Sequence, residues 1–164
     1  MTFPTIYALL QAHFGPDTFP ANTTNPQPYL TVPPDRLIEL CQFLRDDDQL
    51  FFDLLACVTA IDNGLEINTI EVVYNLTSIP YEHNLMIKIV VPRNAEGRPL
   101  PAVSSVSHIW RTADWHEREA FDLVGINFTG HPDLRRILLP TDWNGHPLRR
   151  DYREDEQYHG IKTK

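Results

Sequence analysis

Residues 70–91, Ile-Glu-Val-Val-Tyr-Asn-Leu-Thr-Ser-Ile-Pro-Tyr-Glu-His-Asn-Leu-Met-Ile-Lys-Ile-Val-Val, decide the fold. In its first seven positions, apolar side chains at every second residue alternate with more polar ones, which is the period of a strand with one buried face. The same alternation returns from Leu85 to Val91. Because only a short loop around Pro80 separates the two runs, we expect two neighbouring antiparallel strands.

Further strands are expected on the N-terminal side of this pair. Phe51 to Ile61 is apolar on both faces, which predicts a central strand, and Asn63-Gly64 supplies the chemistry of a tight turn after it. Tyr29 to Val32 predicts a short strand. The sheet is therefore expected to be antiparallel.

Helices are predicted from apolar residues at helical spacing. The clearest runs from Pro34 to about Leu44, and a shorter one is expected over 5–13. After a loop at 92–103, a short helix is expected from Ser104 or Ser105 to Trp110, and another at 114–124. In the last helix Asp114 and Glu117 have the spacing of a capping box, and Gly125 ends it.

These elements predict an α+β body over residues 1–125, in which helices pack on one face of an antiparallel sheet. Residues 126–164 are predicted to form an extended C-terminal interface arm, since no apolar periodicity survives beyond Pro140. Ordering a residue costs roughly 1–2 kcal/mol. We therefore expect the arm to be loosely attached unless a partner covers it.

Composition sets the broad class. The chain has 164 residues, with a formal net charge of −8 that argues against a general nucleic-acid binder. Cys41 and Cys57 form no CxxC pair, which indicates reduced thiols and no disulfide framework. Without a signal-like segment or an apolar run of membrane-spanning length, we expect a soluble chain, or one peripheral through a partner.

Two carboxylates in the 114–124 helix raise an enzymatic alternative. Glu119 and Asp122 are three residues apart and share a helix face, as an acid–base pair of a self-standing hydrolase could. The competing interpretation is structural, with a capping carboxylate and a solvated ion pair between Arg118 and Asp122, which are four apart. The structural interpretation is favoured because no candidate nucleophile or glycine-rich loop lies nearby in the sequence.

The seven histidines follow no metal-binding pattern such as HExxH. His131 and His146 each stand between a glycine and a proline, which favours turns whose imidazole bonds to backbone or carboxylate groups over a metal site. Nucleotide-binding, serine-hydrolase and cysteine-cluster motifs do not occur. The sequence therefore predicts no cofactor bound to this chain.

Charged and aromatic residues are densest between Trp115 and Tyr152, where apolar periodicity is weak. We interpret this stretch as a surface built to be covered by another protein. Its adjacent arginines are expected to point to opposite sides, one toward the body and one toward a neighbour, with forked hydrogen bonds to carboxylates. The candidate interface residues are Glu117, Arg118, Glu119, Asp122, His131, Asp133, Arg135, Arg136, Asp142, Trp143, His146, Arg149, Arg150, Asp151 and Tyr152.

The spacing of these residues resembles a known signature. Glu117-Arg118-Glu119, Asp122-Leu123-Val124, His131, Arg135 and Ile137-Leu138 are similar to the signature of the 30 kDa subunit, also called the C-type subunit, of respiratory complex I. The block from Asp142 to Tyr152 is similar to the tail that follows in that family, and the resemblance covers roughly residues 50–155. Val124 departs mildly from the methionine-phenylalanine pair that often spans 123–124 in relatives.

The resemblance implies a structural subunit of the peripheral arm of an NADH:quinone oxidoreductase that is not catalytic alone. FMN, iron–sulfur clusters and quinone are then expected elsewhere in the complex. The expected partners are the large D-type subunit, which contributes to the quinone pocket, and its neighbours. Attachment to the cytoplasmic face of the bacterial inner membrane would come only through the complex.

Overall fold

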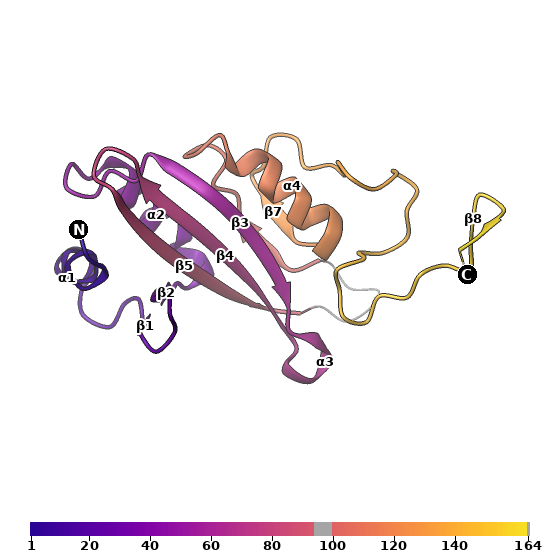
Figure 1. Cartoon of the computed structure of the whole chain (residues 1–164), viewed down its shortest axis with the longest axis horizontal. Helices are drawn as coiled ribbons and strands as arrows, with labels where there is room; N and C mark the ends of the chain where they lie inside the picture. The colour runs from indigo at the N-terminus through magenta and orange to yellow at the C-terminus, as the bar shows by residue number, and fades with distance from the viewer. Residues whose placement is uncertain (94–99, 164) are drawn as a thin grey trace.

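The computed structural model describes residues 1–93 and 100–163. A five-stranded sheet lies beside helices α2 and α4 (Figure 1). The helices are α1 (Phe3–Phe14), the 3-10 helix η1 (Pro34–Arg36), α2 (Leu37–Asp46), α3 (Gly64–Ile67) and α4 (Ala113–Val124). The strands are β1 (Ala21–Asn22), β2 (Tyr29–Thr31), β3 (Leu54–Asp62), β4 (Thr69–Ser78), β5 (His83–Pro92), β6 (Ala102–Ser104), β7 (Asn127–Thr129), β8 (Gln157–Tyr158) and β9 (Ile161–Lys162).

The main sheet has the order β1-β2-β5-β4-β3. Antiparallel pairing of β4 with β5 is confirmed over ten residue pairs, from Thr69↔Pro92 to Ser78↔His83. Strand β3 pairs antiparallel with β4, also as expected. Strand β2 instead pairs parallel with β5, because η1 and α2 carry the chain away before β3 begins at the far edge. The sheet is thus mostly antiparallel, and the expected α+β class is confirmed.

The core lies between one face of the sheet and the helices. Strand β4 alternates strictly between buried and half-buried side chains, and Tyr74 at its centre is fully buried. The predicted apolar stripe of α2 is buried as well, at Leu37, Leu40, Cys41 and Leu44. Burial of each of these leucines contributes roughly 1.5–3 kcal/mol to stability. The opposite face of the sheet is partly exposed and carries the ion pair of Lys88 with Glu71, 3.2 Å apart.

Strand β3 is an edge strand, so its predicted central position is wrong. A bulge between Leu55 and Cys57 adds a residue, so that Leu55 and Val58 are both buried although they are three apart. The bulge hides the two-residue period and makes the segment look apolar on both faces. The expected tight turn at Asn63-Gly64 is also replaced, by the short helix α3.

The segment after the main sheet differs from expectation. Residues 102–104 form β6, which pairs parallel with β7, and only a single turn follows at Val106–Trp110 in place of the expected helix. Ile126 and Phe128 are buried, so the packed body continues through Thr129 and the expected boundary at residue 125 falls inside it. Residues 94–99 of the expected 92–103 loop lie outside the described residues.

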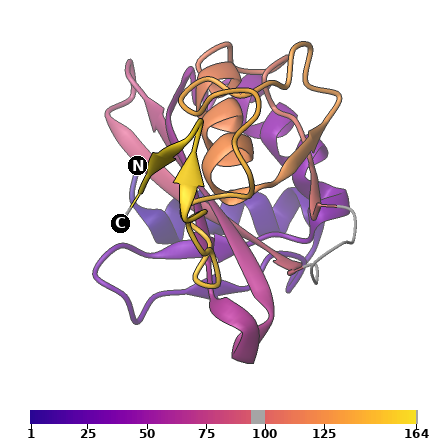
Figure 2. The same cartoon turned by 90° about the vertical axis from the view of Figure 1, so that its right-hand side faces the viewer.

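After β7 the chain runs past α4 as an extended segment and ends in the small β8–β9 hairpin (Figure 2). This segment matches the extended C-terminal arm of the predicted fold class. Within residues 1–93 and 100–163, no helix is long and apolar enough to cross a membrane.

Candidate functional site

Helix α4 collects most of the candidate residues. It begins after Thr112, which makes no side-chain cap, and it ends at Gly125 in the left-handed region with φ 74°. Asp114 is therefore in the first turn and the predicted capping box is wrong. Glu117 instead points into the core, since it is fully buried.

The Glu117 carboxyl group is held by the chain between β6 and α4. The Ser105 hydroxyl lies 2.5 Å from Oε2, and the Val106 N–H donates to Oε1 at 2.8 Å. Burial raises the pKa of Glu117 to about 7, and the two hydrogen bonds only partly oppose this effect. A buried carboxyl group that titrates near neutral pH therefore lies inside the fold.

Arg118 and His131 connect the first turns of α4 to the loop after β7. Arg118 Nε lies 2.8 Å from Asp114 Oδ1, and its Nη2 lies 3.1 Å from Asp133 Oδ2. The Asp133 N–H donates to His131 Nδ1 at 3.0 Å, while His131 Nε2 lies 3.2 Å from the Asp114 carbonyl oxygen. These two bonds fit a neutral imidazole protonated on Nε2. The predicted Arg118–Asp122 ion pair is wrong.

Asp122 is a buried anchor for the following loop. Its Oδ2 accepts from the three consecutive N–H groups of residues 137–139, at 3.0, 2.8 and 2.9 Å. Its Oδ1 accepts from Arg136 Nη1 at 2.8 Å. Burial alone would raise the pKa of Asp122, but the hydrogen bonds from Leu139, Leu138 and Arg136 outweigh it and lower the pKa.

The segment 142–152, called the strap from here on, caps the C-terminus of α4. The last carbonyl groups of a helix have no partner inside the helix. His146 Nδ1 donates to the carbonyl of residue 122 at 2.9 Å, and the Leu148 N–H donates to that of residue 123 at 2.9 Å. Arg149 donates to the carbonyls of residues 124 and 125, at 2.7 and 3.0 Å. A cation at this end also suits the helix dipole.

A second attachment joins the strap to the ends of β3 and β5. Buried Asp62 accepts from Arg93 Nε and from the Arg150 N–H, each at 2.8 Å. Arg93 Nη2 also donates to Asp151. Neither Asp62 nor Arg93 was a sequence candidate, because each looks like an ordinary polar residue at a strand end. The strap is thus tied to the body at two places.

The paired arginines do point to opposite sides. Arg136 is 16% exposed and Arg135 71%, while Arg149 is half-buried and Arg150 exposed. The inner arginines do not both bind carboxylates as expected, since Arg149 binds backbone carbonyls. Arg136 binds Asp122 and, in addition, the carbonyls of Trp143 and Gly145 at 3.2 and 3.0 Å.

The two histidines of the Gly-His-Pro turns bond to backbone groups, so that part of the prediction is confirmed. Burial lowers the pKa of His146. No group of three or more His, Cys, Asp or Glu side chains suited to a metal ion occurs among residues 1–93 and 100–163.

The hydrolase alternative is not supported. Glu119 is exposed, whereas the oxygens of buried Asp122 are occupied by four donors of this chain. An acid–base pair needs two carboxyl groups that are both accessible to a substrate, one on each side of the bond that breaks. Glu119 faces solvent, whereas Asp122 is enclosed by its own chain, so the two carboxyl groups do not face a common substrate site.

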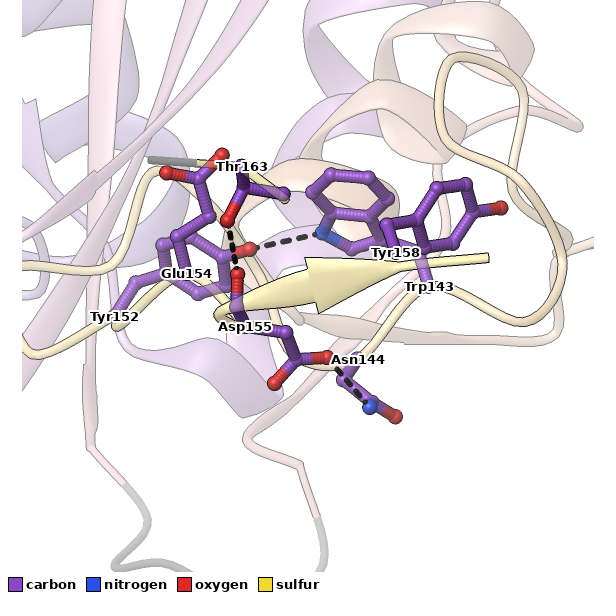
Figure 3. Close-up of a pocket in the computed structure, with 7 residues that line it drawn as sticks. All are labelled: Trp143, Asn144, Tyr152, Glu154, Asp155, Tyr158 and Thr163. Carbon is purple, nitrogen blue, oxygen red and sulfur yellow. Dashed lines mark hydrogen bonds between the residues drawn. The ribbon is translucent and has the colours of Figure 1, made fainter. Parts of the chain in front are cut away.

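The remaining candidates, Asp142, Trp143 and Tyr152, belong to the strap, and Figure 3 shows the last two. Trp143 Nε1 donates to the Tyr152 hydroxyl at 3.1 Å, and both line a cavity of about 10 Å³. Such a space holds roughly one water molecule. Asp142 is exposed and binds Tyr158 and His159 of the terminal hairpin, at 2.9 and 2.8 Å.

Comparison with known proteins finds relatives of this chain by sequence and by fold. The chain is 41% identical over 159 residues to the NADH-quinone oxidoreductase C subunit of Chloroherpeton thalassium, covering 96% of this chain and 63% of that protein. It is 39% identical to the corresponding C subunit of Chlorobium phaeobacteroides, covering 96% and 92%. The fold is also similar to a chain of the membrane-bound sulfane sulfur reductase, an archaeal respiratory membrane complex. There the TM-score is 0.75 at 20% identity, covering 92% and 85% of the two chains.

Residues 30–158 match the family described as "Respiratory-chain NADH dehydrogenase, 30 Kd subunit". The matched residues include the whole of α4 and the strap. The chain therefore belongs to the family of the 30 kDa subunit, or C-type subunit, of the respiratory-chain NADH dehydrogenase.

Proposed function

We propose that this chain is a non-redox structural subunit of the peripheral arm of a proton-pumping NADH:quinone oxidoreductase. In this role it scaffolds the quinone-reducing module and is not catalytic alone. FMN, iron–sulfur clusters and quinone are held by other subunits. The chain packs chiefly against the large D-type subunit of the quinone pocket, on the cytoplasmic face of the membrane.

One observation carries this proposal beyond family membership. The candidate residues Glu117, Asp122, Arg136 and Arg149 are engaged with groups of this chain, and each lies in or against α4. Side chains used this way build a rigid element and leave none of the four free to react with a substrate. Their outward neighbours Arg135 and Arg150 are exposed and available to a partner.

The test removes the chain from cells and compares the remaining complex with the complemented strain. We expect electron transfer from NADH to a soluble artificial acceptor to persist, because the flavin lies elsewhere, while NADH:quinone reduction is lost. Flavin and iron per remaining assembly should stay unchanged. Loss of flavin or iron in proportion to this chain would show that it carries a redox group, which contradicts the proposal.

A further inference from the structure

Trp115 is the unusual residue on the outer side of α4. It is 64% exposed, whereas Trp110, which precedes the same helix, is 3% exposed. An indole group exposes a large apolar area to water, and its burial is among the strongest sources of binding energy at protein interfaces.

The Trp115 side chain is held in place by a chain of charged contacts, called the ladder here. The Arg118 guanidinium lies over the indole, 5.3 Å from the ring centroid, and its own side chain is only 10% exposed. The Arg118 guanidinium forms ion pairs with Asp114 at 2.8 Å and with Asp133 at 3.1 Å. Asp133 also binds Arg135 Nε at 3.1 Å, so the ladder ends in Arg135.

This geometry holds the Trp115 end of the ladder before anything binds, whereas Arg135 at the other end stays largely exposed. The His131 ring, whose side chain is fully buried, accepts the Asp133 N–H and so holds the backbone of the loop against α4. A partner that binds Trp115 therefore contacts an indole that Arg118 already holds, and it loses little further side-chain entropy there. Tryptophan and arginine are also the residue types enriched at interface hot spots.

The charges of the ladder identify the partner's chemistry. Its four charged members balance in sign, but they differ in exposure. Arg135 is 71% exposed, whereas Asp133 is 48% and Asp114 28%. The outermost charge is thus positive and attracts a carboxylate. Exposed Glu119, one turn after Trp115 on α4, repels a carboxylate placed on its own side and so orients the partner.

We propose that Trp115 and Arg135 form a docking point for another protein of the complex. The partner places an apolar side chain against the indole and an aspartate or glutamate against the Arg135 guanidinium. This inference rests on the proposed function, because it takes for granted that the chain is assembled with other subunits.

The test replaces Trp115 by the photo-crosslinking residue p-benzoylphenylalanine in the full chain and irradiates the purified complex. We expect crosslinks to one other protein of the complex, at a peptide that carries Asp or Glu beside apolar residues. The matched control places the same residue at Ile79, which is 61% exposed in the turn between β4 and β5. The control should not crosslink to that peptide.

Charge reversal supplies a second measurement. Arg135→Glu should lower the amount of this chain that co-purifies with the complex by about tenfold, the equivalent of 1.4 kcal/mol. Exchanging the crosslinked carboxylate of the partner for lysine should restore it. The isolated variant must melt within a few degrees of the unchanged chain, since Arg135 is exposed.

The outcomes separate this inference from the proposed function. Crosslinking only to lipid, to a second copy of this chain, or to nothing in a complex that retains the chain would overturn the docking point and leave the proposed function standing. If the unchanged chain does not co-purify with the complex at all, the proposed function itself fails.

Discussion

Glu117→Gln tests the interior of the α4 region most directly. The substitution keeps the size of the side chain and an oxygen that can accept the Val106 N–H, but it removes the ability to ionise. In the neutral form Glu117 can donate to Ser105, whose hydroxyl then donates to Ser107 at 2.8 Å. Glutamine can donate to Ser105 in the same way, so the network survives the change.

The magnitude follows from the pKa of Glu117, which rises from 4.5 to about 7 on folding. The folded state therefore binds the proton more tightly than the unfolded state does. Glu117 lowers stability progressively as pH rises from about 4.5 to about 7, and its full cost is present above pH 7. A shift of this size corresponds to about 3 kcal/mol.

The assay is urea unfolding of the purified chain and of the variant between pH 4.5 and 8.5. The variant should match the unchanged chain near pH 4.5 and be more stable by up to about 3 kcal/mol at pH 8.5. Glu119→Gln, two residues along and exposed, is the control and should show no such widening difference. A variant less stable than the unchanged chain at pH 8.5 would refute the reasoning, since it would mean that the ionised carboxylate stabilises the fold.

The other predictions concern the C-terminal end of α4. Asp122→Asn removes a buried charge that accepts four hydrogen bonds, so urea unfolding should show a loss of about 3–5 kcal/mol. Arg149→Ala should cost about 1.5–3 kcal/mol by the same measurement, because its guanidinium caps two carbonyls, whereas Arg150→Ala should stay within about 0.5 kcal/mol. Gly125→Ala places a methyl group against the His146 ring at a backbone φ of 74°, and hydrogen exchange in the strap should accelerate.

The sequence predicts the parts of the fold whose information is local. The alternation in β4 and β5 and the apolar stripe of α2 each sit within one element, and the structure reproduces them. The end of α4 at Gly125 is predictable for the same reason, because the left-handed backbone conformation that ends many helices is favoured by glycine. Each of these features depends on neighbours in the chain and on little else.

The features that the sequence did not predict depend on contacts between residues far apart in the chain. The bulge at Leu55–Cys57 shifts the register of β3, which no local pattern marks. Strand β6 exists only through its pairing with β7, which begins more than twenty residues later. Asp62 and Arg93 acquire their role from Arg150 and Asp151 across the fold, so neither could be identified by spacing.

In the two arginine pairs the direction of each side chain follows from the sequence, but the groups that the inner arginines bind do not. Alternation in an extended segment placed one arginine of each pair inward, as the exposure of Arg135 and Arg136 shows. The expectation that the Arg149 guanidinium binds a carboxylate is wrong. A helix end has several carbonyl oxygens without a partner inside the helix, and the guanidinium donates to two neighbouring ones instead. The strap consequently needs no run of apolar side chains to be held. At its attachment to α4, Leu148 and Arg149 donate to the carbonyls of Leu123, Val124 and Gly125, while His146 shares the carbonyl of Asp122 with Arg136.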